Sequence, residues 1–232
     1  MSSGIYTSYS GAIANSEELE VIANNIANAS TAGFKRDHVR FDTVLGAAMP
    51  YARAAEDRID LAAGPNRLTG NPLNAAVDGK GFFVFQGEGG QELYTRRGDF
   101  TLGPGGTLVL PNGRPVLGQG GPISIPDGVE AKLRADGSVV ANGVVVGKLR
   151  VVEFPDSTGL VKAGDSAITT APGTTPTEVE NTRIAPGFVE ESNVNLAAEL
   201  VGLIQAQRSF EASMNSLLAN DELTDSLIQS QR

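Results

Sequence analysis

The chain has 232 residues, 41% of them hydrophobic, and a formal net charge of −9 from 18 Lys and Arg against 27 Asp and Glu. This balance, with a mean hydropathy of −0.08, is typical of a soluble globular protein and argues against disorder. A nucleic-acid partner would need a basic surface, so the acidic charge argues against one. The absence of cysteine excludes disulfides and thiolate metal sites.

No apolar run approaches the ~20 residues that span a bilayer, so we expect no membrane insertion. The N-terminus also has neither a basic region nor an apolar region of the kind that forms a secretory signal. If the protein leaves the cytoplasm, we therefore expect a route without a cleaved signal peptide.

The first predicted element is a helix that begins near Ile5 and ends between Ala29 and Gly33, where glycine suits a left-handed cap. Its seam consists of two series with a spacing of seven: Ile5, Ala12, Leu19 and Ile26, and Tyr9, Ser16 and Ala23. Because so thin a stripe buries little surface, we expect this helix to need a partner.

A basic cluster of Lys35, Arg36 and Arg40 follows this acidic helix. One interpretation is that these cations complement the helix dipole. The alternative is a docking patch for the acidic helical surface of a neighbouring subunit. Residues 37–69 come next as a connecting segment, and within it the weak periodicity of residues 41–69 is compatible with helix or extended linker.

Residues 70–189 predict a β-rich outer domain, because short β-prone runs alternate with Gly, Asn and Asp turns. The pair Asn112-Gly113 predicts a type I′ hairpin turn, and Asn142-Gly143 predicts another turn. The predicted strands are 82–85, 93–95, 99–102, 107–110, 123–125, 129–133, 138–140, 144–146 and 149–154.

A second helix is predicted from Asn195 to Ile228, with Asn193 or Asn195 as its N-cap. Its two series with a spacing of seven are Leu196, Leu203, Phe210, Leu217 and Thr224, and Leu200, Gln207, Met214, Asp221 and Ile228. The predicted fold class is α+β: a discontinuous, coiled-coil-like helical layer from residues 1–36 and 190–232, plus an all-β centre. The simpler alternative is that each helix docks on its own globular domain.

Catalysis is poorly supported by the sequence. His38 is the single histidine, and no nucleophile motif accompanies it. The glycine-rich segments lack phosphate-binding spacing, and the Asp-Gly pairs fit turns. Paired carboxylates such as Glu190-Glu191 are neighbours that face apart, so we interpret them as solvated. We predict no catalytic residue, no cofactor and no metal, and therefore no enzyme.

Three blocks of residues carry a family resemblance. The first is Ser10-Gly11, Leu19, residues 23–29 (ANNIANA), Thr31 and residues 33–36; the second is residues 69–73, 76–79, 81–84 and 94–100; the third is residues 187–195, 199–200, Ile204, 207–208 and 210–211. In this combination the chain resembles the flagellar basal-body rod and hook family. The run from Asp60-Leu61 through Gly64-Pro65 to Thr69-Gly70 most resembles a proximal rod subunit, with a distal rod or hook-type protein as the alternative.

The resemblance implies a structural subunit of the axial drive shaft that transmits torque in the periplasm. It implies export by the flagellar type III apparatus, and as partners copies of itself and other rod proteins. The subunit interface would then use Ile5, Tyr9, Leu19, Ile26, Leu196, Leu200, Leu203, Phe210, Met214 and Leu217. A remote alternative is a β domain that binds or cleaves cell-wall glycan with two of Asp78, Asp99, Asp136 and Glu153.

Overall fold

The computed structural model describes the chain except residues 1, 46–49, 127, 180–181 and 231–232. The chain forms two compact units. The helical unit comprises Met1–Ala27, Asp37–Arg58 and Asn195–Arg232, and the strand unit comprises Asn28–Arg36 and Ile59–Val194. The chain therefore passes from one unit to the other four times, after residues 27, 36, 58 and 194.

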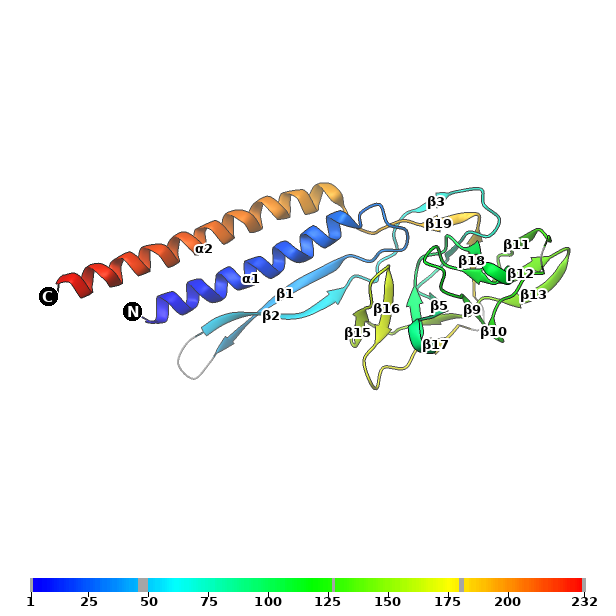
Figure 1. The fold of residues 1–232 in the computed structure, drawn as a ribbon, viewed down its shortest axis with the longest axis horizontal. Helices are drawn as coiled ribbons and strands as arrows, with labels where there is room; N and C mark the ends of the chain where they lie inside the picture. Colours follow the sequence, from blue (N-terminus) through cyan, green and yellow to red (C-terminus); the bar gives the residue numbers. More distant parts are fainter. Residues whose placement is uncertain (1, 46–49, 127, 180–181, 231–232) are drawn as a thin grey trace. The chain divides into compact units, whose positions relative to one another are not determined.

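The helical unit contains two long helices, α1 (Ser2–Ala27) and α2 (Leu196–Ser230). They lie side by side and antiparallel, with the two chain termini at the same end of the pair (Figure 1). Side chains far apart in the sequence fix this register. The hydroxyls of Ser8 and Ser216 lie 3.0 Å apart, and Asn15 Nδ2 donates to Ser213 Oγ at 3.3 Å.

A two-stranded antiparallel ribbon, β1 (Asp37–Leu45) and β2 (Pro50–Ile59), completes this unit, and β1 lies along α1 (Figure 1). The prediction of helix or linker for residues 41–69 was therefore wrong for these strands. Alanines such as Ala52, Ala54 and Ala55 favour helix locally. Packing along a neighbouring element overrides that weak preference, which periodicity alone does not reveal.

A six-stranded sheet organises the strand unit, in the spatial order β15-β16-β6-β5-β14-β17. Its strands are β5 (Phe82–Gln86), β6 (Glu92–Thr95), β14 (Val151–Glu153), β15 (Leu160–Lys162), β16 (Ala167–Thr170) and β17 (Thr177–Glu178). The first two form the predicted hairpin, closed by the 3-10 turn η1 (Glu88–Gly90).

This sheet is buried on both faces, as the continuous apolar run of β5 requires. Phe83 and Phe85 point into one hydrophobic cluster, and Phe82 and Val84 point into the other. The neighbouring strands divide their side chains in the same alternating way. Edge-to-face ring contacts support both clusters, with ring centroids 5.0 Å apart for Phe83–Phe100 and 5.0 Å for Tyr94–Phe154.

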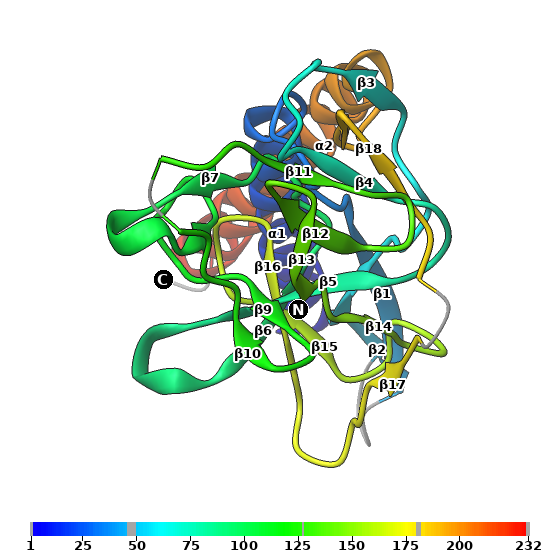
Figure 2. The same ribbon diagram turned by 90° about the vertical axis from the view of Figure 1, so that its right-hand side faces the viewer.

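Smaller antiparallel sheets surround this centre (Figure 2). They pair β3 (Asn66–Leu68) with β19 (Phe188–Glu190), β4 (Ala75–Val77) with β18 (Ile184–Pro186), β7 (Thr101–Leu102) with β8 (Leu108–Val109), and β9 (Leu117–Gly118) with β10 (Gly121–Pro122). A further sheet joins β11 (Ala131–Leu133), β12 (Ser138–Ala141) and β13 (Val144–Lys148), and η2 (Pro104–Gly106) turns between β7 and β8.

The two turns predicted at Asn-Gly pairs differ in their backbone conformation. Asn142 and Gly143 both have positive φ, 48° and 83°, as a type I′ turn between β12 and β13 requires. At Asn112-Gly113 only the glycine has positive φ, so the type I′ prediction there was wrong. The predicted strand at 123–125 is reduced to one bridge, between Ser124 and Thr107.

Residues 28–36 and 190–194 were predicted to belong with the helices, but they lie in the strand unit. α1 ends at Ala27, and Gly33 has the expected left-handed φ, 65°. Asn195 caps α2, because its Oδ1 accepts from Ala198 N at 3.2 Å. The α+β class is confirmed, and a coiled-coil arrangement stays a prediction.

Candidate functional site

The less exposed face of α2 mixes small and polar residues with half-buried apolar ones, among them Leu203, Phe210 and Leu217. Ala206 is buried, and a β-carbon placed on Gly202 or Gly11 would lie 3.5 Å from Ile22 or Ser213 respectively. Both glycines therefore lie on the faces where the two helices meet.

The outer face of α2 exposes large apolar side chains. Their exposed fractions are 47% for Leu196, 46% for Leu200, 55% for Val201, 52% for Ile204, 39% for Met214 and 57% for Leu218. We call these six residues the apolar face of α2. On α1, Tyr9 and Ile13 are also exposed. Such a row on one helix is typical of a surface that a protein partner covers.

The predicted interface residues divide into three groups. Tyr9, Leu196, Leu200 and Met214 are exposed. A second group is half-buried: Leu19, Ile26, Leu203, Phe210 and Leu217. The side chain of Ile5 lies outside the described residues. Contact of any of them with another subunit stays a prediction.

The second predicted series on α2 faces away from α1, and its role in a subunit interface stays a prediction. Leu200, Gln207 and Met214 are exposed, whereas Ala206 and Ser213, one residue earlier, face α1. The first predicted series lies nearer the inner side, where Leu203, Phe210 and Leu217 are half-buried. Both sides of α2 therefore carry apolar residues, and apolarity alone does not tell them apart.

Asn25, from the ANNIANA run, joins three elements of the helical unit. Its buried side chain brackets Asp37 at the start of β1, because Asn25 Oδ1 accepts from Asp37 N and Nδ2 donates to Asp37 O, both at 3.0 Å. Nδ2 also lies 3.4 Å from Glu199 Oε2 in the first turn of α2. One amide thus ties the end of α1 to β1 and α2.

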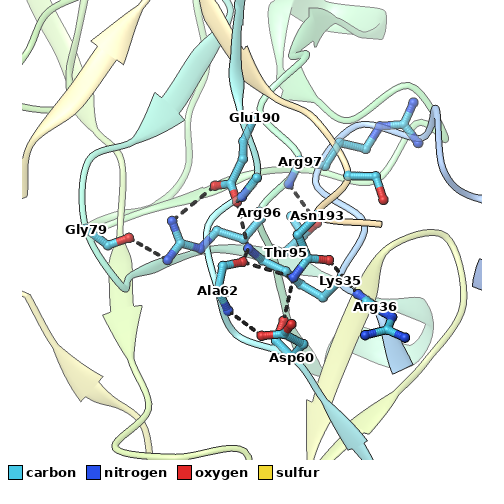
Figure 3. A network of polar contacts seen from close by, with 12 residues as sticks. Lys35, Arg36, Asp60, Ala62, Gly79, Thr95, Arg96, Arg97, Glu190 and Asn193 are labelled. Atoms are coloured by element: carbon cyan, nitrogen blue, oxygen red, sulfur yellow. Dashed lines mark hydrogen bonds and ion pairs between the residues drawn. The ribbon is translucent and has the colours of Figure 1, made fainter. Parts of the chain in front are cut away.

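The strand unit contains a buried ion cluster of Lys35, Glu190 and Arg96, which are 2%, 1% and 1% exposed (Figure 3). Lys35 Nζ donates to Glu190 Oε1 at 2.7 Å, and Arg96 Nη1 donates to Glu190 Oε2 at 3.2 Å. Gly64 N adds a third donor to the carboxylate at 2.9 Å. Three distant segments therefore meet at one buried charge.

Two cations share the carboxylate of Glu190, and the charges of Asp60 and Glu153 also act on Lys35 and Arg96 respectively. Burial lowers the pKa of Lys35, although Glu190 opposes this shift, and burial lowers the pKa of Arg96 in the same way. Backbone carbonyls also accept from both cations, since Lys35 Nζ donates to Ala62 O and Arg96 Nη2 to Gly79 O, both at 2.6 Å. The Arg96 guanidinium also lies 4.9 Å from the centre of the Phe82 ring.

The three residues of the predicted docking patch, Lys35, Arg36 and Arg40, do not form an exposed basic patch among the described side chains. Lys35 is buried in the ion cluster, so it cannot meet a neighbouring subunit's acidic helix in this structure. Arg36 is partly exposed, and its backbone N–H donates to Asn193 Oδ1 at 2.7 Å. The side chain of Arg40 lies outside the described residues.

An active site has little support among the described residues. They form no group of three potential metal ligands, and none of their helices is long and apolar enough to cross a membrane. His38 is exposed. An open groove of about 590 Å³ beside β11 and β12 is lined by Glu130 but by none of the four carboxylates proposed for glycan chemistry.

Comparison with known proteins assigns the family. The family described as "Flagella basal body rod protein" matches residues 5–35, "Flagellar hook protein FlgE/F/G D1 domain" matches residues 76–146, and "Flagellar basal body rod FlgEFG protein C-terminal" matches residues 185–230. These ranges include most of α1, the strands from β5 to β12 and α2. The chain belongs to the flagellar basal-body rod protein family.

Its similar relatives cover nearly the whole chain. The flagellar basal-body rod protein FlgF of Mesorhizobium japonicum is 33% identical over 91% of this chain and 90% of that protein. FlgF of Caulobacter vibrioides is 33% identical over 99% and 98%. The rod protein FlgG of Buchnera aphidicola subsp. Acyrthosiphon pisum is 30% identical over 97% and 98%. The chain is thus a FlgF-like rod protein, as the sequence resemblance predicted.

Sequence reasoning missed the ion cluster and the Asn25 junction. It assigned Glu190 to a solvated pair with Glu191, yet Glu190 is buried while Glu191 is exposed and pairs with Arg67 at 2.7 Å. The sequence does not indicate the partners of Arg96 and Arg97. Arg96 pairs with Glu190, and Arg97 with Asp99 at 2.7 Å. The available signal was position, since Asn25, Lys35, Arg96 and Glu190 all lie in the blocks that carry the resemblance.

Proposed function

We propose that this chain is a structural subunit of the proximal rod of the bacterial flagellum, and that it assembles with copies of itself and other rod proteins into the axial drive shaft. The apolar face of α2 carries the proposal. It lies on the helix that the rod-protein C-terminal family matches, and it is what a subunit needs if neighbours complete its burial.

The physical argument is one of burial. Residues such as Val201, Ile204 and Leu218 are each more than half exposed in the single chain. Transfer of each from water to an interface contributes about 25 cal/mol per Å² of apolar area. A heterologous interface that does not close would repeat this contact along a helical stack. Torque would then pass from subunit to subunit through packed helices.

The proposal includes the place of assembly. Rod assembly in the periplasm requires transit of the chain across the inner membrane, and we propose the flagellar type III apparatus as the route, without cleavage of a signal. A chain without cysteine suits this path because it cannot cross-link during transit.

Substitution on the apolar face tests the proposal. Ile204→Asp should stop rod assembly and swimming when the gene replaces the wild-type copy in the source bacterium, because a charge would be buried at the interface. The purified variant should unfold like wild type, since Ile204 is exposed in the single chain. Electron microscopy of basal bodies and thermal unfolding give the two readouts.

Gln205→Asp is the matched control, because Gln205 is an exposed polar residue next to Ile204 in sequence but lies outside the row of apolar side chains around the helix. It adds the same charge without removing an apolar side chain. Cells that carry it should therefore swim better than cells that carry Ile204→Asp. Normal rods with Ile204→Asp would contradict the proposal.

A distal rod subunit is the second candidate, favoured by the FlgG relative that matches 97% of the chain. The two candidates differ in place along the rod. Labelling the subunit in isolated basal bodies would separate them, because a proximal subunit carries the label at the inner-membrane end.

A further inference from the structure

We propose that the Asn193 side chain is a clamp that ties together three of the four chain segments at which this protein passes between its two units, and that an assembled rod depends on it. The second half of this proposal rests on the proposed function. We call residues 33–36, 59–64 and 190–193 the neck. All of them lie in the strand unit.

The amide of Asn193 uses both of its polar atoms on two other neck segments (Figure 3). Its Oδ1 accepts from Arg36 N at 2.7 Å, and its Nδ2 donates to Asp60 O at 3.0 Å and to Ala62 O at 3.1 Å. Three bonds therefore leave one side chain and reach the backbone of two segments more than 130 residues away in sequence.

The contacted residues lie at the crossings themselves. Arg36 immediately precedes the crossing after residue 36, Asp60 follows the crossing after residue 58, and Asn193 precedes the crossing after residue 194. Direct backbone bonds support the clamp, since Asp60 N donates to Arg36 O at 2.9 Å and Asn193 N lies 3.4 Å from Phe34 O. The segment 33–36 thus has the other two neck segments as partners.

The ion cluster also connects the same three neck segments. Lys35 comes from the first, Glu190 from the third, and the second supplies Ala62 O and Gly64 N as partners. Gly33 N also donates to Glu190 O at 2.8 Å. A neck held by charges, amide and backbone at once behaves as one stiff piece, whereas three separate linkers would bend independently.

Asn193→Asp tests the clamp in the isolated full-length chain. The carboxylate can still accept from Arg36 N, but it cannot donate to Asp60 O and Ala62 O and instead repels them. Hydrogen exchange should become about fivefold to tenfold faster in the peptides that cover 33–36, 59–64 and 190–193 together. Peptides from β5 and β6 should keep wild-type exchange.

Asn112→Asp is the matched control. Asn112 is exposed in a turn of the same unit, and its Oδ1 accepts from Arg114 N at 3.2 Å, a bond that an aspartate can keep. Exchange in the neck should stay at the wild-type rate. If Asn193→Asp does not fold, Asn193→Ser replaces it, since a serine hydroxyl is too short to serve both segments.

Unchanged exchange of residues 33–36 and 59–64 in the Asn193 variant would overturn the clamp. This result does not depend on the rod assignment, because exchange is measured on the isolated chain. In the source bacterium, the Asn193 variant should give a smaller swimming ring than Asn112→Asp at equal protein level. Equal rings despite a loosened neck would overturn the dependence of the rod on the clamp.

Discussion

The two units of this protein solve the problem of burial in opposite ways. The strand unit buries aromatic and aliphatic side chains on both faces of its central sheet and even encloses three charged groups. The helical unit joins two long helices through a contact that mixes small, polar and half-buried apolar residues, and it leaves Val201, Ile204 and Leu218 more than half exposed.

This difference separates a part that is complete by itself from a part that is completed by others. A closed core with paired charges gains little from a neighbour. A helix pair with an uncovered apolar face gains burial whenever another surface covers it. Strand-unit substitutions should therefore act on the stability of the single chain, and substitutions on the apolar face of α2 should act on assembly.

The largest effect on the single chain is expected at Glu190. Glu190→Gln keeps the shape of the side chain but removes the carboxylate with which the buried Lys35 and Arg96 both form ion pairs. We expect a loss of about 3–5 kcal/mol in the free energy of unfolding, measured by denaturant titration. Glu191→Gln is the control, because the exposed Glu191–Arg67 pair contributes at most about 1 kcal/mol. Equal losses for the two variants would contradict the cluster's role.

The second-largest loss of stability is expected for substitution of Gly33. Gly33 has φ of 65°, and a β-carbon there would overlap the backbone of Arg97. Gly33→Ala therefore combines conformational strain with a steric collision. Gly113→Ala is the control, since φ there is 80° but no atom lies within 4 Å. We expect about 1 kcal/mol for the control and clearly more for Gly33→Ala in thermal unfolding. A Gly33→Ala loss no greater than the control's would remove the close approach as a constraint.

The smallest effect is a pH dependence. Burial lowers the pKa of Lys35 below 10.5, so the unfolded chain binds more protons than the folded chain just below that pH. The free energy of unfolding should therefore rise with pH in this window by the contribution of one lysine. Lys35→Met removes the titrating group and still fills the space. The difference between wild type and Lys35→Met should change with pH up to 10.5, and a constant difference would refute this assignment.

The strand unit was predictable where local chemistry decides. The run Phe82-Phe83-Val84-Phe85 became a strand buried on both faces, and Asn142-Gly143 became a tight turn. The ribbon β1–β2 was not predicted, and for β2 the reason is that an alanine-rich segment takes the structure that its neighbours impose.

The candidate site was predictable only in outline. The spacing of apolar residues located the helices, yet it could not tell the side of α2 that meets α1 from the side that stays exposed. Lys35, Arg96 and Glu190 come from three distant segments, and burial of their charges follows from tertiary contacts alone.

Hydrogen exchange of the whole chain, free in dilute solution and assembled in isolated rods, tests the contrast between the units most directly. We predict that α1 and α2 exchange rapidly in the free chain and slowly in the rod, whereas β5, β6 and β14 exchange slowly in both. Strong protection of both helices in the free chain, unchanged on assembly, would show that the helical unit needs no neighbour and would contradict the account.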